Sequence, residues 1–212
     1  MSKICQQLHS LFNSLPRHRF PFDEQAIPHN GIYILFEKGE HAHGADRIVR
    51  VGTHTGENQL RSRLKQHFVN ENKDRSIFRK NIGRAILQRV EDPFLEQWNW
   101  DLTTRKARES YLPLLDEEKQ RWVENAVTEY IQQNFSFVVF QVDNKEERLS
   151  WEQKIISTVS WCKECCPSSN WLGRYSPKIK IRKSGLWLVN GLYKEPLSDN
   201  ELIILKSMIL TG

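Results

Sequence analysis

Two short stretches in which side chains alternate between opposite faces constrain the fold of this chain most. They are "GIYILF" (31–36) and "RIVRVG" (47–52), joined by the polar segment "EKGEHAHGAD", and together they predict a β-hairpin. The predicted core face carries Ile32, Ile34, Val49 and Val51. The predicted opposite face carries Tyr33, Leu35, Ile48 and Arg50. Tyr33 and Arg50 are therefore expected to point the same way.

Helical periodicity dominates the rest of the chain. Apolar side chains three and four positions apart predict helices over 4–15, 53–68, 76–90, 116–135 and 145–161, and a capping pattern from Ser198 to Glu201 opens a last helix. The segment 135–143, "FSFVVFQVD", is apolar on both faces, as expected of a central strand. Ile179 and Ile181 predict a basic strand. We expect an α+β fold with a small three-stranded antiparallel sheet flanked by helices.

Composition indicates a soluble protein of the cytoplasm. The longest apolar runs, "LWLV" and "FVVF", are too short to span a bilayer, and no charged start followed by an apolar stretch opens the chain. Cys5 stands alone, whereas Cys162, Cys165 and Cys166 crowd into "WCKECC". This spacing fits neither a disulfide framework nor a four-ligand zinc set, so reduced thiols are predicted. His41 and His43 are predicted to lie in a solvated hairpin loop.

Charge is segregated along the sequence. Residues 61–89 hold nine Lys/Arg and two Asp/Glu, a net charge of +7, whereas residues 91–134 hold ten acids and five bases. A second basic group follows at 178–183. Clustered bases predict a phosphate-binding surface, and an ordinary solvated helix face is the open alternative. The residues expected to contact DNA are Arg75, Arg79, Lys80 and Arg84, on the outer face of a helix that buries Ile77, Ile82 and Ile86, together with Lys178, Lys180, Arg182 and Lys183.

One carboxylate falls on the wrong side of its helix. In the helix 145–161 the inward series is Leu149, Glu152, Ile156 and Val159. An unpaired buried carboxylate costs several kcal/mol, so Glu152 is expected to pair with a base or to bind a cation. Tyr33, Arg63 and His67, on separate elements, add a phenol, a fixed cation and an imidazole. Together these groups suit metal-assisted hydrolysis of a phosphodiester.

Five short motifs in order resemble the GIY-YIG nuclease family. They are "GIY" at 31–33, "RVG" at 50–52, the arginine and histidine of "RSRLKQHF", the glutamate of "SWEQKII" and the asparagine of "PSSNW". The resemblance implies a catalytic domain over 30–175 with a helical insertion at about 91–134. An N-terminal helix and basic linker (1–29) precede this domain, and a C-terminal basic strand and helix (176–212) follow it.

The resemblance also implies roles for individual residues. Tyr33 matches the base that deprotonates the attacking water, and Arg63 the arginine that holds the scissile phosphate. His67 matches a histidine beside the nucleophile or phosphate, and Glu152 the protein ligand of a divalent metal, Mg²⁺ or Mn²⁺. Asn170 matches the residue that buttresses the site.

One departure from the family concerns Arg50. It stands where the second motif usually begins with tyrosine, and the spacing from Gly52 to Arg63 is longer than in compact members. We expect Arg50 to favour the phenolate of Tyr33, with a plain phosphate contact as the alternative.

The predicted function is metal-dependent endonuclease cleavage of DNA, with a restriction or defence role and a homodimer on DNA as the arrangement that would cut both strands. Two alternatives stay open at this point. One is a catalytically inactive nucleic-acid-binding protein of the same fold, and the other is a DNA-repair nicking enzyme. No membrane partner is expected.

Overall fold

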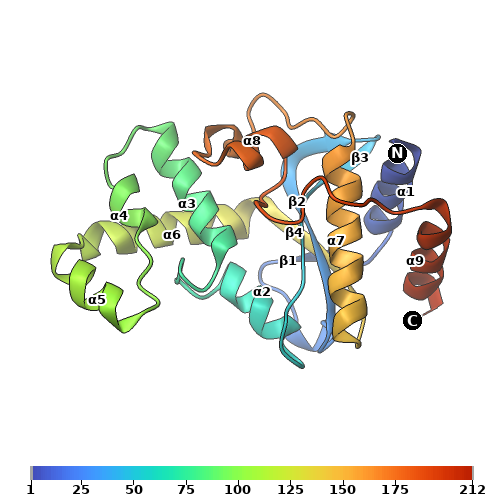
Figure 1. Cartoon of the computed structure of the whole chain (residues 1–212), viewed down its shortest axis with the longest axis horizontal. Helices are drawn as coiled ribbons and strands as arrows, with labels where there is room; N and C mark the ends of the chain where they lie inside the picture. Colours follow the sequence, from blue (N-terminus) through green and yellow to red (C-terminus); the bar gives the residue numbers. More distant parts are fainter. Residues whose placement is uncertain (1, 212) are drawn as a thin grey trace.

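The computed structural model describes residues 2–211 and has one antiparallel sheet with helices on both faces (Figure 1). The sheet has four strands in the order β1-β4-β2-β3. They are β1 (His18–Arg19), β2 (Gly31–Ala42), β3 (Ala45–Gly52) and β4 (Phe135–Gln141). The expected α+β class is confirmed, and β4 is a central strand as predicted. The sheet has one strand more than expected because the basic linker pairs with β4, His18 opposite Phe137.

Helices cover both faces of the sheet (Figure 1). One face packs against α1 (Ser2–Asn13), α7 (Lys145–Trp161) and α9 (Asp199–Thr211). The other packs against α2 (Leu60–Phe68), α3 (Ile77–Arg89) and α6 (Glu117–Asn134), and α4 (Leu95–Asn99) packs on α3. The remaining helices are α5 (Arg105–Tyr111), α8 (Ile179–Ser184) and the short 3₁₀ turns Glu24–Ala26, Leu112–Leu114 and Leu172–Tyr175. Because α1 and α9 share one core with α7, both terminal segments are part of the same folded unit. None of the helices in the described part of the chain is long and apolar enough to cross a membrane.

The hairpin is tighter than expected, and it contains a bulge. Most of the predicted polar loop is strand, so that only His43 (φ 54°) and Gly44 (φ 75°) form the turn. Leu35 pairs with Arg50, but Phe36 pairs with Ile48, which leaves Val49 as an extra residue. The bulge exchanges the faces predicted for Ile48 and Val49. It leaves Tyr33 and Arg50 on the same face, as predicted.

The predicted outer face of α3 is wrong. Ile77 is 42% exposed, whereas Arg79, Lys80 and Arg84 are buried. Arg79 forms an ion pair of 2.7 Å with Glu124 of α6, and Lys80 lies 2.9 Å from a carboxylate oxygen of Asp74. The acidic segment 91–134 thus packs on the basic helix, and its Glu124 neutralises Arg79 inside the protein. Periodicity could not reveal this because Glu124 is 45 residues from Arg79.

The predicted basic strand near the C-terminus is also wrong. Residues Ile179–Ser184 form α8, which ends at Gly185 in the left-handed conformation (φ 69°). Ile181 is buried, but Ile179 is 56% exposed. Two isoleucines two positions apart fit one face of a strand and a short helix equally well. Gly185, which ends the helix in the left-handed conformation, favours the helix.

The prediction of a solvated loop for His43 is wrong as well, and Cys5, although its thiol is free as predicted, is not isolated from the other cysteines. Cys5 is buried, with its Sγ 3.4 Å from Sγ of Cys165. The His43 side chain is only 2% exposed and lies against the same thiol, whereas His41 is 68% exposed as expected. Contacts between segments this far apart in sequence carry no local signal.

Candidate active site

Gly31 and Gly52 stand at positions of the hairpin where a larger residue would clash with its neighbours. Gly52 lies directly opposite Tyr33 in the β2–β3 pair, and a Cβ on Gly52 would clash with the Tyr33 hydroxyl oxygen. A Cβ on Gly31 would clash with the carbonyl oxygen of Phe140 in β4. Glycine is required at both positions because the sheet itself and the phenol occupy the space of a side chain.

Tyr33 is fully buried and contacts His67 of α2. Its hydroxyl lies 2.7 Å from His67 Nε2, and His67 Nδ1 lies 2.8 Å from the hydroxyl of Ser76. Burial holds the pKa of His67 well below its usual value, and the nearby cations, first Arg63, lower it further. His67 is therefore a neutral imidazole with one nitrogen free to accept a proton.

Arg50 brings a buried positive charge to the same hydroxyl. Its Nε donates to the Tyr33 hydroxyl at 3.4 Å, and another of its nitrogens donates to the carbonyl of Trp187. No carboxylate forms a salt bridge with Arg50 among the described residues. A buried guanidinium without an ion-pair partner is suited to an anionic ligand such as phosphate.

Glu152 projects from the middle of α7 toward the same region. Burial raises the pKa of its carboxyl above the usual range, while Arg50, the backbone N–H of Thr53 and Arg63 act in the opposite direction. Thr53 donates to one carboxylate oxygen at 3.1 Å. Of the two predicted alternatives, a salt bridge to Glu152 is absent within residues 2–211, so the carboxylate remains available to a cation. Leu149, predicted as inward, is 36% exposed beside it.

Arg63 lies one turn before His67, at the rim of the site. Its guanidinium donates to Gln66 at 2.9 Å and to the carbonyl of Arg75 at 3.0 Å. It lines a pocket of about 340 Å³ with Thr53 and His54. His54 itself is held by two backbone groups, the N–H of Gly31 and the carbonyl of Gly56, which accounts for it as a structural residue.

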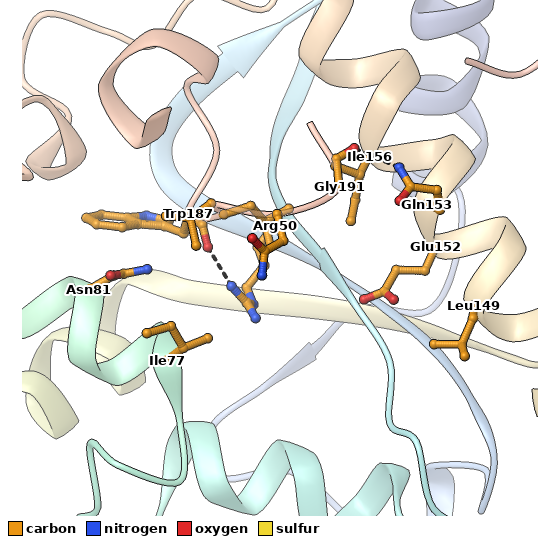
Figure 2. Close-up of a pocket in the computed structure, with 12 residues that line it drawn as sticks. Arg50, Ile77, Asn81, Leu149, Glu152, Gln153, Ile156, Trp187 and Gly191 are labelled. Atoms are coloured by element: carbon orange, nitrogen blue, oxygen red, sulfur yellow. Dashed lines mark hydrogen bonds between the residues drawn. The ribbon is translucent and has the colours of Figure 1, made fainter. Parts of the chain in front are cut away.

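A neighbouring cavity of about 370 Å³ contains Arg50 and Glu152, which face each other across it in Figure 2. The Thr53–Glu152 hydrogen bond joins the two pockets. Asn81 of α3 also lines this cavity, and its side-chain nitrogen is buried without a hydrogen-bond partner in the described structure. The amide points toward Arg50 in Figure 2. No sequence motif marked this residue.

The structure does not bring Asn170 to the cavity. Asn170 is exposed in the loop after α7, whereas Asn190 of "LVNG" lines the cavity with Glu152. A site asparagine after the glutamate helix was expected, and three asparagines satisfy that order in sequence, namely Asn170, Asn190 and Asn200. Only the path of the chain through Trp187 to Gly191 distinguishes them.

The basic residues that were predicted to contact DNA divide into an exposed group and a buried group. Arg75 is exposed, as are Lys178, Lys180, Arg182 and Lys183 on and next to α8. Arg79, Lys80 and Arg84 are committed to internal partners, including Asn99 for Arg84 at 2.7 Å. The exposed group alone is available to a ligand in solution.

The sequence model of the GIY-YIG domain matches residues 6–211, nearly the whole chain. The chain belongs to the GIY-YIG family. Neither a curated protein nor a solved structure matches it. Membership implies a nuclease that uses a divalent metal and suggests a DNA substrate. The family match also extends beyond the 30–175 segment, in agreement with the terminal helices sharing its core.

Proposed function

We propose that the protein is a metal-dependent endonuclease that hydrolyses phosphodiester bonds of DNA. Two observations carry this proposal. Tyr33 is hydrogen-bonded to both His67 and Arg50, and Arg50 shares a cavity with Glu152, with Arg63 in the adjoining pocket. These groups come from β2, β3, α2 and α7, which no single local motif would assemble.

Tyr33 is the proposed base, and His67 receives its proton. Ser76 Oγ has two lone pairs and can accept from His67 Nδ1–H as well as from the N–H of Arg79, which it caps. In that tautomer His67 Nε2 accepts the Tyr33 hydroxyl proton. As Tyr33 takes a proton from the attacking water, it passes its own to His67, so that no free phenolate needs to exist beforehand. The negative charge of the bound phosphate offsets the arginines that help to lower the pKa of His67 in the free protein, and so lets the imidazole take up the proton.

Three donors are proposed to hold the phosphate. Arg63 and Arg50 supply positive charge for the non-bridging oxygens, where charge develops in the transition state. The unpartnered side-chain nitrogen of Asn81 is aimed into the same cavity and can complete its hydrogen bonding on such an oxygen. Asn190 takes the buttressing role in place of Asn170.

Glu152 fits the divalent metal that the family implies. It is an oxygen ligand without an ion-pair partner, held by Thr53 at one oxygen, and Mg²⁺ commonly binds one or two carboxylates together with substrate phosphate and water. A bound Mg²⁺ or Mn²⁺ would act as a Lewis acid at the scissile phosphate. Glu152 is proposed to hold this ion.

A restriction or defence role, with a homodimer cutting both strands, is proposed as the biological setting. A protein that only binds nucleic acid has no need of a raised carboxyl pKa beside two uncompensated arginines. That contrast favours catalysis over the inactive alternative.

Cleavage of supercoiled plasmid, with and without added Mg²⁺, tests this function. Magnesium should be omitted rather than chelated, so that other bound metals stay in place. The proposal expects nicked or linear product only with Mg²⁺ or Mn²⁺, and none from Glu152→Gln. DNA binding without cleavage in either metal would favour the catalytically inactive alternative. Cleavage of a labelled RNA duplex, but not of DNA, would mean that the substrate is RNA.

A further inference from the structure

A second group of metal-ligating side chains lies away from the candidate active site. Cys5 and His9 occupy one face of α1, His43 forms the turn between β2 and β3, and Cys165 follows α7. One ligand atom from each lies within 4.8 Å of the others. Three segments far apart in sequence thus present two thiols and two imidazoles to one point.

The spacing of these atoms fits a tetrahedral zinc ion. Zn–S bonds of about 2.3 Å and Zn–N bonds of about 2.0 Å place two sulfurs about 3.8 Å apart, and a sulfur and a nitrogen about 3.5 Å apart. Cys5 Sγ lies 3.4 Å from Cys165 Sγ, which lies 3.3 Å from His43 Nε2 and 3.9 Å from His9 Nε2. A disulfide would need the two sulfurs at about 2.05 Å.

Both histidines have the second contact that metal-bound imidazoles usually make. His43 Nδ1 lies 3.4 Å from a carboxylate oxygen of Glu164, which leaves Nε2 facing the thiols. His9 Nδ1 lies 2.9 Å from the carbonyl oxygen of Cys5, which leaves its Nε2 as the ligand atom. Such contacts fix the tautomer and orient the ring toward the ion.

The fourth ligand position needs a choice between two residues, because His9 already accepts a hydrogen bond and Cys162 lies nearby. The N–H of Ile48 lies 3.2 Å from His9 Nε2, so metal binding there replaces that hydrogen bond. Cys162 Sγ lies 3.4 Å from His43 Nε2, and its C-x₂-C spacing with Cys165 is frequent in zinc sites. His9 is favoured because its ligand atom, unlike that of Cys162, belongs to the group within 4.8 Å.

We propose that Cys5, His9, His43 and Cys165 bind one Zn²⁺ that fastens α1, the β2–β3 turn and the segment after α7 to one another. The site is structural, since all four side chains are buried and four protein ligands leave no open position for a substrate. Its soft thiolates distinguish it from the oxygen ligand Glu152.

This zinc would support the active site at a distance. The hairpin that His43 closes carries Tyr33 and Arg50, and the helix that ends before Cys162 carries Glu152. Tying the hairpin turn to the end of α7 fixes the two elements that the proposed catalytic groups occupy. Loss of zinc should therefore loosen both.

Metal content of the protein purified without chelator tests the site. Wild type should carry one zinc per chain, and His43→Asn should lose it. Cys166→Ser is the matched control because Cys166 is exposed and donates instead to the carbonyl of Lys163. A wild-type protein free of zinc after growth and purification with added zinc would overturn the proposal.

Two further measurements keep the proposal falsifiable if a variant fails to fold. Cobalt-exchanged wild type should show the charge-transfer absorption of thiolate-bound Co²⁺, and four free thiols should titrate after denaturation with chelator. Two free thiols would mean a disulfide and would overturn the proposal. Retention of zinc by His9→Asn together with its loss from Cys162→Ser would overturn the assignment of His9.

Discussion

The hydroxyl of Tyr33 lies 2.7 Å from Nε2 of His67, and both side chains are fully buried. His67 is neutral at physiological pH because burial and three nearby arginines lower its pKa. A phenol hydrogen-bonded to a neutral imidazole has a direct acceptor for its proton. This pair is the structural reason to expect that Tyr33 acts as a base without prior ionisation.

Replacing His67 should slow cleavage without abolishing DNA binding. His67→Gln keeps a side chain that can hydrogen-bond Tyr33 but cannot accept its proton, so the single-turnover rate should fall by about 10²–10⁴-fold. Tyr33→Phe should give a similar loss. Tyr130→Phe is the matched control, because it removes a half-buried hydroxyl that is bound to Glu37 rather than to the site. An unchanged rate in His67→Gln would exclude the proton transfer.

Arg50 is expected to speed the chemical step. Its Nε–H contacts the Tyr33 hydroxyl, and its guanidinium lines the cavity in which negative charge is proposed to develop on the phosphate. Single-turnover cleavage at saturating DNA, where binding does not limit the rate, should slow by about 10²–10³-fold in Arg50→Gln. Arg50→Lys, which keeps the positive charge, should recover part of that loss. A wild-type rate in Arg50→Gln would mean that Arg50 contributes to DNA affinity alone.

The buried carboxylate of Glu152 is expected to lower the stability of the folded protein. Its pKa is raised on folding from 4.5, so the folded protein binds the proton more tightly than the unfolded chain does. The free energy of unfolding therefore falls as pH rises from about 4.5 to the raised pKa and stays at the lower level above it, and no penalty remains well below 4.5.

Glu152→Gln should consequently unfold at a higher temperature than wild type at neutral pH without Mg²⁺, and the difference should vanish in acid. Thermal unfolding across pH measures this. Glu195→Gln, which removes an exposed carboxyl, should show no such pattern. A destabilised Glu152→Gln at neutral pH would indicate a structural ion pair instead.

Local patterns predicted those parts of the site whose contacts are set within one element or one hairpin. Tyr33 and Arg50 share a face because strand alternation survives the bulge at Val49, and Glu152 was found because a carboxylate interrupts an apolar stripe. The order of the five short motifs identified Arg63 and His67 as candidate site residues. These predictions needed no knowledge of distant segments.

The errors share one physical cause, which is pairing across long sequence separations. The burial of Arg79 depends on Glu124, and the cluster around His43 depends on Cys5 and Cys165. Asn81 gave no signal because an asparagine within a helix is ordinary until its amide is found without a partner.

The exposed basic residues near α8 are expected to bind DNA phosphates. Replacing Lys178, Lys180, Arg182 and Lys183 with Gln should make log K less steep in log salt, by about 0.9 for each phosphate of duplex DNA that the variant no longer neutralises. The matched control changes four exposed bases of the acidic segment 91–134 to Gln, namely Arg105, Lys106, Arg108 and Arg121. Equal slopes for the two variants would mean that DNA does not contact α8.

The roles of Tyr33 as base and Glu152 as metal ligand can be checked together by measuring DNA binding and single-turnover cleavage in parallel. The proteins are zinc-containing wild type, Tyr33→Phe, Glu152→Gln and Tyr130→Phe. We predict that all four bind DNA, and that wild type and Tyr130→Phe cleave it once Mg²⁺ is added. Tyr33→Phe should bind but cleave at least about 100-fold more slowly, and Glu152→Gln should bind without cleaving. Cleavage at the wild-type rate by Tyr33→Phe or Glu152→Gln would contradict the account.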